Sequence, residues 1–383
     1  MSAVTIATGP LAAARRIVVK IGSSLLVDPE SGELQVGWLD ALAHDVAELR
    51  RAGVEVVIVS SGAVALGRHG LGLGHGVLKL EESQAAASVG QVWLAHTYRE
   101  ALARRGLETA QILLTLGDSE QRRRYLNARN TLKTLLGLGA VPVVNENDTV
   151  ATSEIRYGDN DRLAARVVQM VSADRLVLLS DVEGLFSADP ALSPDARFIP
   201  LVERVTDAIE AMATGVRTPT GSGGMVTKIA AARIATAAGC DVIIASGRRP
   251  RPLQALADGA PHTRFQAEAT PRAARKQWIA GSLELRGAVV VDDGAVSALG
   301  RGNSLLAAGL VAVEGDFQRG DAVAIRDARG NTVAQGLVAY SSAEAQQLRG
   351  LRSEEFGQVL GYVGRDELVH RDDMVVFGHK EQQ

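Results

Sequence analysis

Short apolar runs rich in Val and Ile recur along the first two thirds of the chain. Runs of this kind are typical of strands that are buried on both faces of a parallel sheet. They cover residues 17–21, 54–60, 109–114, 141–145, 175–180 and 241–245. We therefore expect each of these runs to be a buried, parallel strand.

Segments with the period of an amphipathic helix separate the runs. In the first of them the apolar residues share one helical face and Gly53 follows as a stop signal. These apolar residues are Trp38, Leu39, Leu42, Val46 and Leu49. Similar patterns cover residues 83–104, 119–136, 161–172 and 225–238. Strands and helices in alternation predict an α/β fold, an open and mostly parallel sheet sandwiched by helices.

Two polar segments, 148–161 and 183–219, interrupt the alternation of strands and helices. In the second of them we expect a short helix at 206–212. The pattern of apolar and polar residues changes after residues 266–281, which we interpret as a linker. Apolar runs at 288–291, 309–313 and 322–325 are separated by Asp-Asp-Gly, Glu-Gly-Asp and Arg-Gly-Asp, which we interpret as turns. The pattern predicts an α/β domain over residues 15–265 and a small β-rich domain over residues 282–370.

Composition and charge narrow the class of protein. Of the 383 residues, 46% are hydrophobic and 22% are charged, which is typical of a soluble globular chain of about two domains. The formal net charge of -3 gives no excess of positive charge of the kind that binds nucleic acid or an anionic membrane. The single cysteine, Cys240, excludes an intrachain disulfide and suits a reducing compartment. No signal-peptide pattern or membrane-length apolar run is present, so we expect a cytoplasmic protein.

A glycine-rich stretch, Thr220-Gly221-Ser222-Gly223-Gly224, runs directly into the helical pattern that starts at Met225. Its glycines let the backbone approach a ligand closely, and the unpaired N–H groups of a helix start attract an anion. The stretch matches neither the Walker A pattern nor Gly-x-Gly-x-x-Gly. By itself it fits a flexible turn before a helix equally well, so it indicates a phosphate site only together with other residues.

Polar residues follow the predicted strands where each strand ends. Ligands of an open α/β sheet bind beyond the carboxyl ends of its strands, so these residues should gather in one crevice. They are Lys20, Gly22 and Ser23; Ser60, Ser61 and Gly62; Asn145, Glu146, Asn147 and Asp148; and Ser180 and Asp181.

Lys20 stands inside the apolar run of the first strand, where a charge is costly unless an anion or a carboxylate meets it. Together with Lys228 it predicts a clamp of two lysines for a transferring phosphoryl group, whose negative charge must be neutralised in the transition state. Taken singly, these features also fit a solvated strand end, a helix cap or a turn. The seven histidines are scattered without a metal-type spacing, and the strand ends lack Gly-x-Ser-x-Gly, so neither a histidine metal site nor a serine hydrolase is indicated.

Six motifs together resemble, in order and spacing, the glutamate 5-kinase family of the amino-acid-kinase superfamily. The motifs are Val18-Val19-Lys20-Ile21-Gly22-Ser23-Ser24, Val59-Ser60-Ser61-Gly62-Ala63-Val64, Val144-Asn145-Glu146-Asn147-Asp148, Gly158-Asp159-Asn160-Asp161, Leu179-Ser180-Asp181-Val182-Glu183-Gly184-Leu185 and Gly223-Gly224-Met225-Val226-Thr227-Lys228. The C-terminal domain is similar to PUA domains in Val289-Val290-Val291-Asp292-Asp293-Gly294-Ala295 and Arg301-Gly302-Asn303-Ser304-Leu305-Leu306.

The resemblance implies ATP-dependent phosphorylation of the γ-carboxylate of L-glutamate, the first step of proline biosynthesis, with Mg²⁺ bound mainly through the nucleotide. It also implies a role for each matching residue. Lys20 and Lys228 would contact the transferring group, Asp161 would hold the two lysines, and Gly22 and Gly62 would offer backbone N–H groups. Glutamate would be bound by Ser61, Asp148 and Asn160. ATP would be bound by Lys20, Ser180, Asp181, Ser222, Gly223, Gly224, Met225, Val226, Thr227 and Lys228, and no residue is assigned as a metal ligand.

Three further expectations rest on the resemblance: a homo-oligomer (dimer or tetramer), proline as a feedback inhibitor, and a response of the loop 151–157 to proline. A related kinase acting on N-acetylglutamate, aspartate, carbamate or UMP stays open as an alternative. A protein that binds RNA through its PUA-like domain is another. Against the latter, residues 282–365 hold ten acidic and eight basic residues and form no basic stripe, so nucleic acid is not expected as the main partner.

Overall fold

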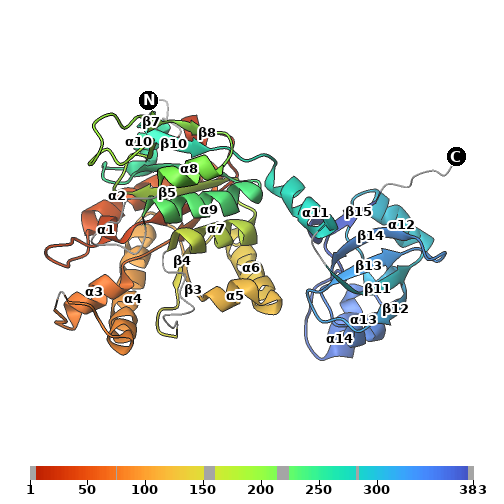
Figure 1. Ribbon diagram of the computed structural model, residues 1–383. Helices are drawn as coiled ribbons and strands as arrows, with labels where there is room; N and C mark the ends of the chain where they lie inside the picture. The colour runs from red at the N-terminus through yellow and green to blue at the C-terminus, as the bar shows by residue number, and fades with distance from the viewer. Residues whose placement is uncertain (1–5, 75, 151–159, 214–223, 282–283, 378–383) are drawn as a thin grey trace. The chain divides into compact units, whose positions relative to one another are not determined.

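The computed structural model describes residues 6–74, 76–150, 160–213, 224–281 and 284–377. The chain divides into two compact units, Met1–Pro271 and Arg272–Gln383 (Figure 1). The predicted α/β domain, 15–265, lies inside the first unit. Upstream of residue 15, Ile6 and Leu11 are buried in its core, so the unit also uses part of the N-terminal segment.

Eight of the described strands of the first unit form one sheet with the order β3-β4-β2-β1-β5-β9-β10-β8. Their bounds are β1 Arg16–Ile21, β2 Glu55–Val59, β3 Thr109–Leu114, β4 Val141–Glu146, β5 Arg175–Ser180, β8 Leu201–Val202, β9 Asp241–Ser246 and β10 His262–Phe265. The six predicted runs are the parallel strands of this sheet, whereas β10 pairs antiparallel to β9. A small hairpin, β6 Leu185–Phe186 and β7 Phe198–Ile199, lies in the polar segment after β5.

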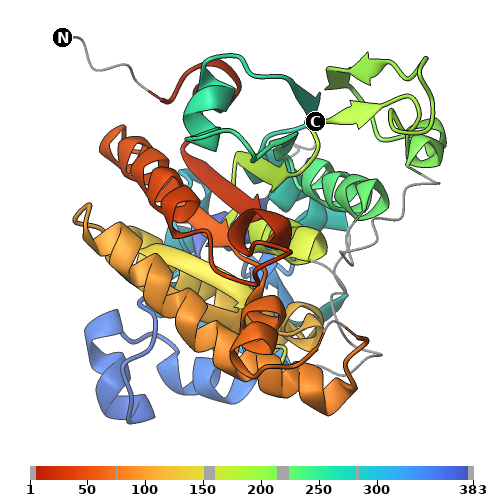
Figure 2. The same cartoon turned by 90° about the vertical axis from the view of Figure 1, so that its left-hand side faces the viewer.

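Helices cover both faces of the sheet (Figure 2). Because side chains alternate along a strand, Val19 of β1 packs with the helices of one face and Val18 with those of the other. The first face carries α2 Val36–Arg51, α4 Leu80–Ala103 and α10 Pro252–Ala257, and the second α6 Arg122–Gly137, α7 Asn160–Val171 and α9 Met225–Ala237. Shorter helices are α1 Ser23–Leu26, α3 Ala63–Gly70, α5 Leu116–Glu120 and α8 Asp207–Met212.

Two local expectations are corrected. The run at 109–114 is not buried on both faces, because β3 is the edge strand of the sheet and most of its residues are half-buried. The helix expected over 119–136 is two helices, α5 and α6, because Gln121 between them has an extended backbone (φ -76°, ψ 113°).

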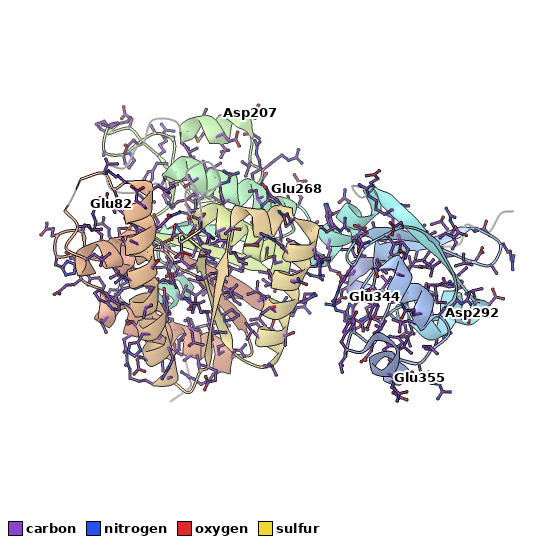
Figure 3. All side chains as sticks on the ribbon, turned by 90° about the horizontal axis from the view of Figure 1, so that it is seen from below. Glu82, Asp207, Glu268, Asp292, Glu344 and Glu355 are labelled. Atoms are coloured by element: carbon purple, nitrogen blue, oxygen red, sulfur yellow. The ribbon has the colours of Figure 1, made fainter. Side chains whose placement is uncertain are left out.

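In the second unit the described strands form a five-stranded sheet with the order β12-β11-β13-β14-β15. The bounds are β11 Leu285–Val291, β12 Leu310–Gly315, β13 Ala322–Arg326, β14 Thr332–Leu337 and β15 Met374–Val376, with helices α12 Asp293–Gly300, α13 Ser342–Leu348 and α14 Phe356–Leu360. The Asp-Asp-Gly expected as a turn is instead a helix start, because Asp292 accepts a hydrogen bond from the N–H of Ala295 at 2.7 Å and caps α12 (Figure 3).

The division between the units, after Pro271, falls inside the range 266–281 expected as a linker. Most of that range is helix α11 Pro271–Gly281, which belongs to the second unit from Arg272 onward. Arg275 of α11 pairs with Asp373 at 2.7 Å, and both side chains are nearly buried. The second unit thus extends on both sides of the predicted range 282–370, to α11 and to β15. Over the described residues, no helix has the length and apolar character that crossing a membrane requires.

Candidate functional site

Lys20 is the second-last residue of β1, between β2 and β5. It shares a strand face with Val18, which is packed against the helices of the second face of the sheet, and only 6% of its surface is exposed. A buried ammonium group requires a counter-charge. Asp161 provides it, with Oδ1 2.6 Å from the Nζ of Lys20.

Asp161 is the second residue of α7 and is fully buried. The first turn of a helix has unpaired N–H groups and a partial positive charge, which favour a carboxylate there. Its Oδ2 accepts a hydrogen bond from the Oγ1 of Thr227 at 3.0 Å and lies 3.5 Å from the Nζ of Lys228. Burial alone would raise the pKa of Asp161, but the charges of Lys20 and Lys228 and the hydrogen bonds from Lys20 and Thr227 outweigh it and lower that pKa.

Lys228 lies in the first turn of α9, and 6% of its surface is exposed. Its helix packs against α7, which brings Lys228 to the same carboxylate as Lys20 although the two lysines are far apart in the sequence. We call Lys20, Asp161 and Lys228 the charged triad. Two ammonium groups share one carboxylate, so the triad has an excess positive charge in a nearly water-free place, which attracts and stabilises an anion.

A second group of polar residues surrounds Asn160, the residue before Asp161. The Nδ2 of Asn160 donates hydrogen bonds to Ser61 Oγ at 3.2 Å, to Asn145 Oδ1 at 2.8 Å and to the carbonyl oxygen of Ser60. These contacts bring together the carboxyl ends of β2 and β4 and the start of α7. Asp148, expected to bind the same ligand, lies two residues beyond the end of β4 and is half-buried.

The two glycines expected beside a phosphoryl group differ in their backbone. Gly62 precedes α3 with φ 94°, a left-handed conformation, and a Cβ added there would lie 3.2 Å from Cγ2 of Val27. The N–H of Gly22 instead donates to the carbonyl oxygen of Leu179 at 3.2 Å and extends the pairing of β1 with β5. In this structure the backbone N–H of Gly22 is thus engaged by the neighbouring strand.

The described residues that are expected to bind a nucleotide lie at the carboxyl end of β5 and at the start of α9. Ser180 ends β5, is nearly buried, and donates a hydrogen bond from Oγ to Oδ1 of Asp181 at 3.0 Å. Gly224 is the residue before α9, and its carbonyl oxygen accepts a hydrogen bond from Thr227 Oγ1 at 2.8 Å. In the first turn of α9, Met225 packs against the core while Val226 is 51% exposed. Ser222 and Gly223 lie outside the described residues.

Two side chains near Asn160 have no role in the sequence-based prediction. Gln91 accepts a hydrogen bond from Asn145 at 2.7 Å, and the hydroxyl of Tyr98 lies 3.1 Å from Ser60 Oγ. Both come from the middle of α4, where the sequence shows an amphipathic helix without a motif. Only the three-dimensional packing of α4 against the ends of β2 and β4 reveals them. In the part of the chain that the structure describes, no three His, Cys, Asp or Glu side chains cluster as metal ligands do.

Comparisons with known proteins show which families the two parts of the chain match. The Amino acid kinase family matches residues 15–246, and the PUA domain matches residues 287–360. The chain is 58% identical to the glutamate 5-kinase of Paramagnetospirillum magneticum over 369 residues, which cover 96% of this chain and all of that one. It is 56% identical to the glutamate 5-kinase of Nitrobacter hamburgensis, with 95% of this chain and 96% of that one covered.

Among solved structures, the chain is similar to a carbamate kinase from Giardia lamblia bound to AMP-PNP. The TM-score is 0.49 at 17% sequence identity, and the match covers 67% of this chain and 99% of that one.

Proposed function

The chain belongs to the amino acid kinase family, and from this premise we propose that it phosphorylates the γ-carboxylate of L-glutamate with ATP to give L-glutamyl 5-phosphate, the first step of proline biosynthesis. The high identity to glutamate 5-kinases over nearly the full length supports the choice of substrate. The observation that carries the chemistry is the charged triad, in which Lys20 and Lys228 meet on Asp161.

The reaction joins a carboxylate oxygen of the acceptor to the γ-phosphorus, while the bond from that phosphorus to the β–γ bridging oxygen breaks and ADP leaves with the electron pair. A carboxylate is already ionised at neutral pH, so no general base is needed. Alignment and neutralisation of charge can therefore carry the catalysis. Two ammonium groups that are fixed before the reaction supply this neutralisation without reorganising.

In this assignment Lys20 acts from the acceptor side and Lys228 from the nucleotide side. Asp161 keeps both in place, and its lowered pKa keeps the carboxylate charged. Ser61, Asp148 and Asn160 bind glutamate, and Gly62 offers a backbone N–H beside the phosphoryl group. Ser180, Asp181 and the stretch from Ser222 to Lys228 bind ATP, with Ser222 and Gly223 outside the described residues.

We propose that Mg²⁺ accompanies the nucleotide, because Mg²⁺ is usually held by substrate phosphates and one or two carboxylates. Asp181 directly follows β5 and is itself one of the residues expected to bind the nucleotide, and its Oδ1 accepts a hydrogen bond from Ser180. The ion would supply neutralisation of the phosphate charge. The charged triad itself has its carboxylate oxygens engaged by lysines and Thr227 and does not offer them to a metal.

Three further proposals rest on the family resemblance. Proline is proposed as a feedback inhibitor and a dimer or tetramer as the assembly, while the loop 151–157 that would respond to proline lies outside the described residues. A cytoplasmic location is proposed as well. The single cysteine, buried and not in a disulfide, suits a reducing compartment.

A coupled assay of ADP release tests the proposed function. We expect release that depends on L-glutamate, together with a product that hydroxylamine traps as a hydroxamate, because an acyl phosphate reacts with this nucleophile. If ADP release does not respond to L-glutamate while N-acetylglutamate, aspartate, carbamate or UMP is phosphorylated, the assignment is wrong.

A further inference from the structure

A chain of three side-chain amides links α4 to the start of α7. The Oε1 of Gln91 accepts a hydrogen bond from Asn145 Nδ2 at 2.7 Å, and Asn145 Oδ1 accepts one from Asn160 Nδ2 at 2.8 Å. We call Gln91, Asn145 and Asn160 the amide relay. It starts on a helix that covers the sheet and ends at a residue proposed to bind glutamate.

The orientation of the middle amide is fixed by two independent contacts. A side-chain amide has an oxygen that only accepts and an NH₂ group that only donates hydrogen bonds. The backbone N–H of Glu146 donates to Asn145 Oδ1 at 2.9 Å, so the oxygen of Asn145 must lie on that side. Gln91 holds the opposite end by accepting from Asn145 Nδ2. Asn145 can therefore offer only its oxygen to Asn160.

This orientation decides which end of Asn160 is left for a ligand. The NH₂ group of Asn160 has two protons, and Asn145 Oδ1, Ser61 Oγ and the carbonyl oxygen of Ser60 already accept from it. Across the described residues, no hydrogen bond to Asn160 Oδ1 is formed, and the residue is half-buried. An amide oxygen in such a place is an acceptor for a positively charged donor, and a hydrogen bond to a charged group is among the stronger ones.

We propose that Gln91 is a positioning residue which, through Asn145, leaves the Asn160 amide oxygen to accept from the α-ammonium of the substrate. The inference rests on the proposed function and deepens it. The site then selects an acid with a free α-ammonium group over acids that lack this group or carry it acylated, because neither can donate in the same way to the oriented oxygen.

Helix α4 also contacts Ser60, whose carbonyl oxygen accepts a hydrogen bond from Asn160. Tyr98 is seven residues after Gln91, two helical turns along α4, and therefore lies on the same helical face. Its hydroxyl is 3.1 Å from Oγ of Ser60, whose carbonyl oxygen accepts from Asn160. The tyrosine is fully buried, and burial raises the pKa of its hydroxyl, so that group stays a neutral hydrogen-bond partner. Two side chains of α4 thus orient one asparagine.

Substitutions at Gln91 test the proposal in the full-length enzyme. Gln91→Met keeps the length of the side chain and removes the acceptor, and Gln91→Leu repeats this change if the first variant folds poorly. Gln91→Glu keeps an acceptor for Asn145 Nδ2. The matched control is Thr97→Ala, which removes only a hydrogen bond within α4, from Thr97 Oγ1 to the carbonyl oxygen of Trp93.

The readouts are kcat and KM for L-glutamate, KM for ATP, and kcat/KM for glutarate, which has the same carboxylates without the ammonium group. We expect Gln91→Met to lower kcat/KM for L-glutamate about 10- to 100-fold through KM, the range for a lost hydrogen bond to a charged group. KM for ATP and kcat/KM for glutarate should stay within about two-fold, and both Gln91→Glu and Thr97→Ala should stay near the unmodified enzyme.

A loss that is equal for L-glutamate and glutarate, or an equal loss in Gln91→Glu, would overturn the proposal, since it would indicate a purely structural role. An unchanged KM for L-glutamate in Gln91→Met would overturn it as well. The proposed function fails separately, if the unmodified chain releases no ADP in response to L-glutamate.

Discussion

Asp161 sets the electrostatics of the site at the scale of single residues. It is fully buried, as an isolated carboxylate could not be without a large loss of hydration energy. Lys20 and Lys228 are each 94% buried and have the same difficulty. The three charges stabilise one another, so the removal of any one leaves the others buried and uncompensated.

Asp161→Asn is expected to lower kcat at least about 100-fold, because the two ammonium groups lose the carboxylate that holds them for the transition state. It should also lower the free energy of unfolding by about 3–5 kcal/mol, the cost of breaking a buried ion pair. Steady-state kinetics and urea denaturation measure the two effects. Thr227→Val is the control for stability, since it removes no charge but only the hydroxyl that hydrogen-bonds the same carboxylate and the carbonyl oxygen of Gly224. It should cost about 1 kcal/mol.

The pH dependence of stability tests whether the lysine charges, which lower the pKa of Asp161, outweigh burial, which raises it. A lowered pKa means that the carboxylate stabilises the fold fully above the ordinary value of 3.8 and that this contribution is lost as the pH falls through the folded-state pKa. The difference in unfolding free energy between the unmodified chain and Asp161→Asn should stay constant from pH 7 to about 4 and shrink in more acidic solution. A difference that already shrinks between pH 7 and 5 would mean that burial raises the pKa instead.

Lys20 was predictable as a site residue because a charge inside an apolar run is costly, and Lys228, Asp161 and Asn160 were predictable from motifs. Gln91 and Tyr98 could not be predicted from the sequence. Both residues occupy ordinary positions of an amphipathic helix, and their proposed role depends on which strand ends the helix contacts. A pattern within one helix does not contain that contact.

At the scale of elements, helices α3 and α4 pack against each other with very little space between their backbones. A Cβ added to Gly67 of α3 would lie 1.7 Å from the carbonyl oxygen of Ala86, and one added to Gly90 of α4 would lie 1.9 Å from that of Ala63. The two backbones touch because neither glycine has a side chain. This contact fixes α4, which carries the start of the amide relay, against α3, which begins after Gly62.

Gly67→Ala is therefore expected to force the two helices apart and to lower the free energy of unfolding by about 3 kcal/mol, at the upper end of the usual cost of overpacking. KM for L-glutamate should rise with it, while KM for ATP should change less. Gly137→Ala, at the last residue of α6, serves as the control because a Cβ there meets nothing within 4 Å. It should be neutral or stabilise by about 0.5 kcal/mol, and equal effects of the two substitutions in denaturant titrations would contradict this account.

The six parallel strands of the sheet were predictable because each is a continuous apolar run with little polar interruption. The elements that the sequence did not reveal have weaker patterns. Helix α3 has only eight residues, and Ala63, Gly67 and Gly70 among them lie at the contact with α4. Strand β10 has four residues of mixed polarity. The order of strands, which places β3 at the edge, depends on long-range pairing that no local pattern encodes.

At the scale of the whole molecule, the two compact units have separate cores. Every described residue of the charged triad and the amide relay belongs to the first unit, before residue 229. The second unit is held together partly by the nearly buried pair Arg275–Asp373, which fastens α11 to its sheet. Stability of the second unit and chemistry of the first should therefore be separable.

Asp373→Ala is expected to lower the thermal transition of the second unit, because it leaves the charge of Arg275 nearly buried without its partner. Turnover with saturating substrates should stay within about two-fold. The control Arg326→Ala breaks an exposed pair with Glu314 in the same unit and should cost less than about 1 kcal/mol. Calorimetry together with the ADP assay distinguishes the two units, and a parallel loss of activity would show that they are not independent.

In the proposed mechanism, two lysines that are positioned by one buried carboxylate stabilise the transferring phosphoryl group. The most direct measurement is single-turnover phosphorylation of L-glutamate by Lys228→Met, with near-UV circular dichroism to verify the fold. We predict that the rate of phosphoryl transfer falls at least about 100-fold while the spectrum is unchanged. A folded Lys228→Met enzyme that transfers the phosphoryl group at the unmodified rate would contradict the account.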